Sequence, residues 1–132
     1  MANMGNWMEA SVLNEYFRGN SVTPPTTLYL ALYTSDPTSA DTGTEITGGS
    51  YARQVVTFAA PTVQGTKSQI VSNITLTYPL ATANWGDVAY WAIRTAATGG
   101  NMLAYGAFSQ VKTIASGDQY VVQTGNITLT LD

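Results

Sequence analysis

The sequence has no cysteine and no histidine, and it has few charged residues of either sign. Its 132 residues include five Lys or Arg and eight Asp or Glu, so charged residues make up 10% of the chain and the net charge is −3. An average soluble protein carries about 25%. The missing residue types exclude catalysis centred on His or Cys, zinc sites with their usual ligands, and disulfides. The few, scattered basic residues argue against a nucleic-acid partner.

Signals for membranes, export and nucleotide binding are missing as well. No apolar run approaches the roughly 20 residues that span a bilayer, and residues 1–5 lack the basic region and apolar core of a secretory signal. No glycine-rich phosphate loop occurs, and without histidine no serine can form a Ser–His pair. We therefore expect no membrane partner, no cofactor, no metal site and no enzymatic activity.

What the chain does contain is a series of short alternating segments separated by Gly, Pro and Asp turns. In residues 27–34 both faces are apolar, which predicts a strand that is covered on both sides. This pattern predicts a mainly β fold: an antiparallel β-sandwich or jelly roll of about seven to eight strands, with one short N-terminal α-helix. The predicted strands are residues 27–34, 53–59, 69–78, 87–95, 102–108, 119–123 and 126–131.

The helix is expected to begin at Asn6 as N-cap, with Glu9 in the capping-box position, and to end at Gly19. Residues 1–132 are expected to form one domain, with the helix and a proline linker in residues 1–25 and the sandwich in residues 26–132. The helix either packs on its own domain or docks on a neighbouring subunit. The apolar residues that could make that contact are Trp7, Met8, Val12 and Phe17.

Three acidic residues, Asp36, Asp41 and Glu45, lie in a long polar segment, residues 36–50. They are ordinary turn residues, calcium ligands, or part of a loop that becomes ordered on a neighbour. Arg53 follows this segment, and its partner is either a carboxylate of another subunit or Asp41 or Glu45 of its own chain. A catalytic pair of carboxylates is disfavoured, because most acidic residues lie in turn contexts.

Aromatic residues cluster around residues 85–91, where Trp85 precedes the neighbouring Tyr90 and Trp91. Since Tyr90 and Trp91 point to opposite faces of one strand, a single covered face buries only one of them. The alternatives are packing in the core, contact with another subunit, and stacking on a sugar. Trp85 and Trp91 are therefore interface candidates.

The chain resembles a family of small tailed-bacteriophage virion proteins, commonly labelled tail-fibre-like or minor structural proteins. The resemblance extends over nearly the whole chain, including the N-terminal helix. It rests on residues 29–38 (YLALYTSDPT), 43–45 (GTE), 48–54 (GGSYARQ), 83–86 (ANWG), 96–101 (AATGGN), 103, 105–107 (YGA) and 127–132 (ITLTLD).

This resemblance implies a non-enzymatic structural protein located in the virion and assembled in the host cytoplasm. We expect a head decoration or cement protein that binds and stabilises the assembled capsid, with a tail-fibre or baseplate component that contributes to host attachment as the alternative. The implied partners are other virion proteins, either the major capsid protein or tail proteins. A homo-oligomer, with a trimer favoured, is also expected.

Overall fold

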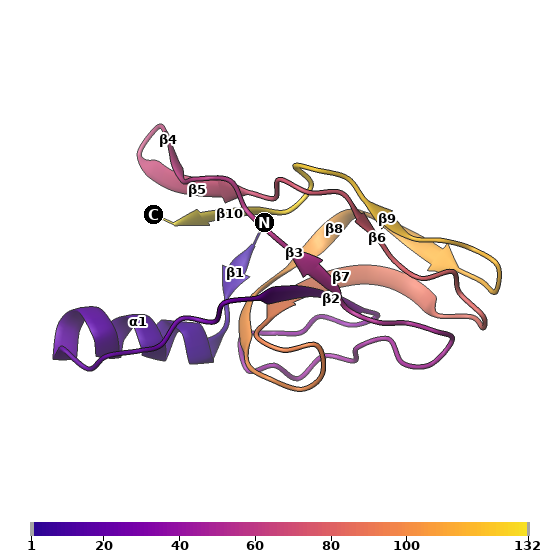
Figure 1. The fold of residues 1–132 in the computed structure, drawn as a ribbon, viewed down its shortest axis with the longest axis horizontal. Helices are drawn as coiled ribbons and strands as arrows, with labels where there is room; N and C mark the ends of the chain where they lie inside the picture. Colours follow the sequence, from indigo (N-terminus) through magenta and orange to yellow (C-terminus); the bar gives the residue numbers. More distant parts are fainter. Residues whose placement is uncertain (1, 132) are drawn as a thin grey trace.

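The computed structural model describes residues 2–131; Met1 and Asp132, the ends of the predicted domain, lie outside the described residues. It contains a five-stranded sheet with two smaller sheets on one side of it (Figure 1). All strand pairs are antiparallel. The prediction of a mainly β sandwich with one N-terminal helix is confirmed.

The order of strands in the large sheet is β1 (Asn3–Met4), β8 (Met102–Ile114), β7 (Gly86–Arg94), β2 (Leu28–Tyr33) and β3 (Gln54–Val56). The second layer consists of a three-stranded sheet and a two-stranded sheet. They contain, in order, β10 (Thr128–Leu131), β5 (Lys67–Val71) and β4 (Thr62–Gln64), and then β6 (Leu76–Thr77) and β9 (Val121–Val122). The helix α1 (Asn6–Arg18) precedes all strands except β1.

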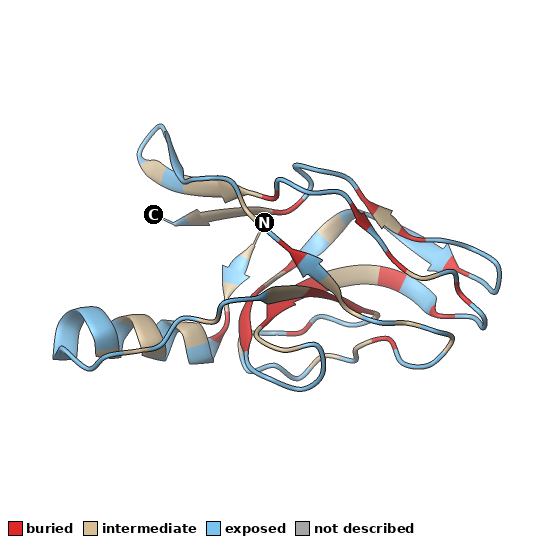
Figure 2. Ribbon diagram, viewed as in Figure 1, coloured by how far each residue is buried: buried red, intermediate tan, exposed pale blue. Residues whose placement is uncertain are grey.

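Strand β2 is buried on both faces, as its two apolar faces predict. Leu30 and Leu32 are fully buried in the main core between the layers, and Ala31 and Tyr33 lie in a smaller cluster on the opposite face. On that opposite face, Arg94 joins β2 to the segment after it by donating to the Tyr33 hydroxyl at 3.0 Å and to the Asp41 carboxylate at 2.7 Å. The centre of the molecule is therefore buried, while α1 and the β4–β5 end are largely exposed (Figure 2).

The predicted strand 69–78 is wrong, because the chain changes sheets at Ser72. The buried Ser72 Oγ accepts the backbone N–H groups of Gly125 and Ile127, each at 3.2 Å. These bonds direct the chain away from β5, which pairs with β10, toward β6, which pairs with β9. The alternating residues 69–78 therefore contribute to two different sheets, through β5 and β6.

The structure has ten strands where about seven to eight were predicted. Strands β1 and β4 were not predicted, because two or three residues are too few to show a period of two. Strand β8 continues six residues beyond the predicted end at residue 108, since its outer half pairs with the start of β7. Within residues 2–131, no helix has both the length and the apolar character needed to cross a membrane.

Candidate assembly interface

Helix α1 is attached to the sandwich only at its first turn. Gly5, just before the helix, is buried and donates its N–H to the Leu103 carbonyl oxygen at 2.9 Å. A Cβ at this position would lie 2.8 Å from the Met102 carbonyl oxygen, so only glycine fits there. Met8 packs against the main core, and the rest of the helix projects away from the sandwich (Figure 1).

The two ends of α1 were predicted with unequal success. Gly19 ends the helix as predicted: its φ of 70° is in the left-handed region, and its N–H donates to the Asn14 carbonyl oxygen. The capping box of Asn6 and Glu9 is wrong, because Gly5 occupies the N-cap position and no side chain caps the helix. Asn6 is already the first helical residue, and its N–H donates to the Ser39 carbonyl oxygen at 2.9 Å.

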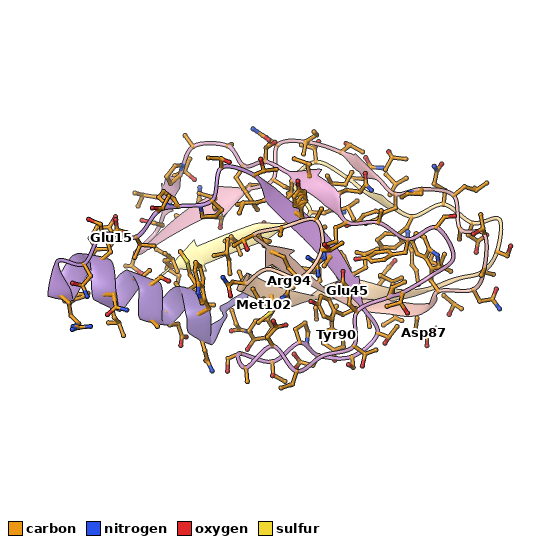
Figure 3. The ribbon with its side chains drawn as sticks, turned by 60° about the horizontal axis from the view of Figure 1, so that its bottom comes forward. Glu15, Glu45, Asp87, Tyr90, Arg94 and Met102 are labelled. Atoms are coloured by element: carbon orange, nitrogen blue, oxygen red, sulfur yellow. The ribbon has the colours of Figure 1, made fainter. Side chains whose placement is uncertain are left out.

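No residue of α1 is buried, although seven of its 13 residues are apolar. In its outer two turns, Leu13, Tyr16 and Phe17 are 57%, 77% and 78% exposed. Their spacing places them on one side of the helix. At about 100° per residue, Glu15 and Arg18 lie on the other side; Figure 3 shows Glu15 toward the outer end of α1. Among the predicted interface residues, Trp7 and Phe17 are exposed, and Met8 and Val12 are half-buried.

An apolar cavity of about 470 Å³ lies between the base of α1 and the three-stranded sheet. Its walls come from α1, β1, β2, β5, β7, β8 and β10, together with Phe58 and Pro61, and no charged residue contributes to them. The large apolar residues in its wall include Met4, Met8, Ile70, Leu103, Leu129 and Leu131.

The three-stranded sheet that forms the outer wall of this cavity is thin and poorly covered. No residue of β4 or β5 is buried. The register places Val63 and Leu131 opposite Ser68, so all three share the face that carries the cavity residues. Val63 and Leu131 are 75% and 57% exposed. We call α1, this sheet and the cavity between them the forked end of the molecule.

A comparison of the sequence with known protein families identifies the family of this chain. A family model described as "Podophage GP4 fiber I protein gp80" matches residues 3–130. The chain belongs to this family. No match was found among the curated proteins. Because the family is a phage fibre family, the predicted resemblance to a phage structural protein is confirmed, and the chain is a virion structural protein that associates with other virion proteins.

The three acidic residues in residues 36–50 of this fibre-family chain have partners within the chain. The Arg53 guanidinium donates two hydrogen bonds to the Glu45 carboxylate, at 2.7 and 2.8 Å, and Arg94 donates one to Asp41 at 2.7 Å. Figure 3 shows Arg94 and Glu45 near each other. Asp36 accepts the Thr38 N–H at 2.9 Å, as a turn residue does. Of the two partners open to Arg53, the structure therefore selects its own chain.

These ion pairs fix residues 36–50 to the sandwich rather than leaving the segment free for a neighbour. Both arginines also donate to the Gly99 carbonyl oxygen, which ties this segment to the β7–β8 turn. The described residues contain no group of three or more His, Cys, Asp or Glu side chains that could hold a metal ion. The calcium alternative is disfavoured, because Asp41 and Glu45 are engaged by arginines.

Titratable groups around these pairs have shifted pKa values. The hydrogen bond to Glu45 raises the pKa of Arg53, and although burial opposes it, the hydrogen bond to Asp41 raises the pKa of Arg94. Burial raises the pKa of four tyrosines above 10.0, and for Tyr120 to about 12. The four are Tyr33, Tyr51, Tyr78 and Tyr120. These shifts mark a packed, water-poor interior and not a reactive site.

The two interface candidates in the aromatic cluster are core residues. Trp85 and Trp91 are 5% and 4% exposed. Trp85 donates its indole N–H to the Gly49 carbonyl oxygen at 2.9 Å and packs edge-on against Tyr51 and Tyr78. Trp91 borders a polar hollow but is covered by its neighbours. Neither indole presents the open ring face that sugar stacking requires, so of the three alternatives the burial of both side chains favours packing in the core.

Sequence reasoning missed part of the forked end. The sequence predicts the apolar helix but not the cavity. The cavity is lined by residues from seven secondary-structure elements, and no local sequence pattern indicates that these elements meet. Val63 and Leu131 could have been singled out only as apolar residues in short Thr- and Gln-rich strands. Leu13 and Tyr16 are not among the four predicted contact residues of the helix, yet they are among the most exposed large apolar residues of the described chain.

Proposed function

We propose that this chain is a structural building block of a virion fibre, attached through its forked end to neighbouring virion proteins. The observation that carries this proposal is the presence of an exposed apolar helix face and an apolar cavity at the same end of a phage fibre-family chain. Exposed apolar surface of this extent is typical of sites where proteins join. The protein acts by binding, and each contact stabilises the assembled state over the free one.

The rest of the chemistry supports a binding role over a catalytic one. Asp41 and Glu45 are used in ion pairs. No buried side-chain nitrogen or oxygen among the described residues lacks a hydrogen-bond partner. The low charged fraction of 10% lets uncharged Thr, Ser, Asn and Gln provide most of the surface polarity, and these residues are less costly to desolvate in an assembly than charges are.

A head decoration protein is the second candidate. A small sandwich with little surface charge suits a module that covers a capsid lattice, and this was the leading expectation from the sequence. The fibre named in the family description favours the first candidate. In either case we propose one domain spanning residues 1–132, without enzymatic activity, and a trimer as the favoured state of association.

Particles produced without this chain separate the two candidates. Loss of a fibre, with heads that keep the heat resistance of the wild type, supports the fibre proposal. Complete fibres with heads that burst at lower temperature contradict it and favour decoration.

Supplying variants of the chain during assembly of these particles then tests whether the forked end attaches the chain to the particle. We expect the double variant Leu13→Ser/Phe17→Ser to be absent from purified particles, because it removes exposed apolar contacts without touching the core. Leu80→Ser, at 53% exposure elsewhere on the surface, is the matched control and should be incorporated normally. Normal incorporation of the helix variant contradicts attachment through α1.

A further inference from the structure

We propose that the cavity of the forked end is the binding site for the outer half of α1 from a second copy of this chain. The helix of each copy is a plug, formed by Leu13, Tyr16 and Phe17, and the cavity of each copy is its socket. This inference rests on the proposed function and names the partner of the same surface.

The outer turns of α1 cannot fill the cavity of their own chain. The helix leaves the sandwich at Gly5, and Met8 is its contribution to the cavity wall. At a rise of 1.5 Å per residue, Phe17 lies about 18 Å along the axis from Gly5. Since the first turn is fixed to the sandwich, Tyr16 and Phe17 point beyond the cavity of their own chain. Another copy can present them to it.

The size and polarity of the cavity match this plug. An apolar cavity of about 150 Å³ holds one benzene-sized group, so the cavity of about 470 Å³ accepts about three groups of that size. The plug consists of two aromatic rings and one leucine. The Tyr16 hydroxyl needs a polar partner when it is buried, and Ser68 in the cavity wall offers a hydroxyl group.

Charge does not oppose the contact. The cavity wall contains no charged residue. On the helix, Glu15 and Arg18 lie on the side away from the plug, and Arg18 is already bonded to the Asn14 side chain at 2.9 Å. The helix can therefore enter without burying an unpaired charge, which would be costly.

The contact area fits a stable association between copies. Aromatic side chains bury about 150–250 Å² each, so the plug buries about 450 Å² and covers a similar area of the socket. Two copies that exchange helices make two such contacts, about 1,800 Å² in total. Stable, specific interfaces bury about 1,200–2,000 Å². Reciprocal exchange in a dimer, or cyclic exchange around a three-fold axis in a trimer, satisfies both apolar surfaces of each chain and closes the assembly by symmetry.

The absence of native cysteine allows a direct test by cross-linking. One purified chain carries Phe17→Cys and a second, with a different mass tag, carries Ser68→Cys at the exposed edge of the cavity. We expect mild oxidation to give the mixed disulfide between the two tagged chains. Leu80→Cys replaces Phe17→Cys as the control and should give none. Equal cross-linking in the control, or no mixed disulfide, overturns the proposal.

The mass of the purified chain gives an independent readout. We expect native mass measurement to show a closed oligomer of two or three copies. Leu13→Ser/Phe17→Ser and the cavity-filling Ser68→Phe should each raise its dissociation constant at least about tenfold. Thr62→Phe, on the opposite face of the same sheet, is the control that should not. A monomeric wild type, or a small apolar molecule retained in the cavity, overturns the proposal.

These results are distinct from those that test the fibre. A monomer that still builds fibres leaves the proposed function intact and removes the second copy as partner. An oligomer joined by α1 in particles whose fibres do not depend on it leaves the helix–cavity contact intact and removes the fibre role.

Discussion

Replacing Arg53 with methionine tests whether the Arg53–Glu45 ion pair stabilises the folded monomer. The Arg53 side chain is 6% exposed and donates to both oxygens of Glu45 and to the carbonyl oxygens of Ala96 and Gly99. Methionine keeps the apolar stem and removes the charge and all of these donors. The variant therefore leaves the Glu45 carboxylate with the hydrogen bond from Tyr51, at 2.7 Å, as its remaining side-chain contact among the described residues.

The expected loss of stability follows from the burial of the pair. Removing one partner of a buried ion pair costs about 3–5 kcal/mol. Because the Glu45 side chain is 22% exposed and keeps its bond from Tyr51, we expect the lower end, about 3 kcal/mol. For 132 residues the entropy of unfolding is about 0.28 kcal/mol/K, so the melting temperature should fall by about 10 °C.

Urea unfolding followed by tryptophan fluorescence measures this loss, since the buried Trp85 and Trp91 become exposed on unfolding. Arg18→Met is the matched control: Arg18 is exposed and bonds only to the Asn14 side chain, so its replacement should change stability by less than about 0.5 kcal/mol. A loss below about 1 kcal/mol for Arg53→Met refutes the internal role. Unchanged stability with loss of self-association would instead assign Arg53 to a partner.

Three further predictions concern stability. Because burial raises the pKa of four tyrosines above 10.0 in the folded state, their contribution is fully present below pH 10 and is lost as the pH rises through their folded values; absorbance at 295 nm should show them ionising only as the chain unfolds. Normal titration of all eight tyrosines near pH 10 contradicts this. Tyr78→Phe removes the 2.6 Å bond to the buried Leu30 carbonyl oxygen and should cost about 1–3 kcal/mol in urea unfolding, whereas no loss would mean that the carbonyl finds another donor. Gly19→Ala should cost about 1 kcal/mol in the same assay, because φ is 70° and no atom crowds the site; a stabilised variant contradicts the left-handed cap.

The fold class could be predicted because long strands carry a period of two over several residues. Strand β2 is the clearest case: Leu30 and Leu32 on one face and Ala31 and Tyr33 on the other predicted cover on both sides, and both faces are buried. The break at Ser72 could not be predicted, because it depends on N–H groups of residues more than fifty positions away. Alternation describes which way a side chain points, but not which sheet the strand joins.

The candidate site was predicted only where its signal is local. The apolar side of α1 is visible in the spacing of its residues, and Phe17 is exposed as an interface residue must be. The sequence left the role of Trp85 and Trp91 open, because large aromatic residues are equally typical of interfaces and cores. The partner of Arg53 was left open for a related reason: both candidates, Asp41 and Glu45, lie nearby in sequence, and only the folded segment brings Glu45 to the guanidinium.

The most direct test of the central claim is the position of this chain on the intact particle. A small gold label on an exposed surface away from the forked end, for example at Val111, can be imaged on purified particles by electron microscopy. If the chain is a fibre building block, the label should lie along the fibres and be missing from the head. A label distributed over the head lattice contradicts the fibre role.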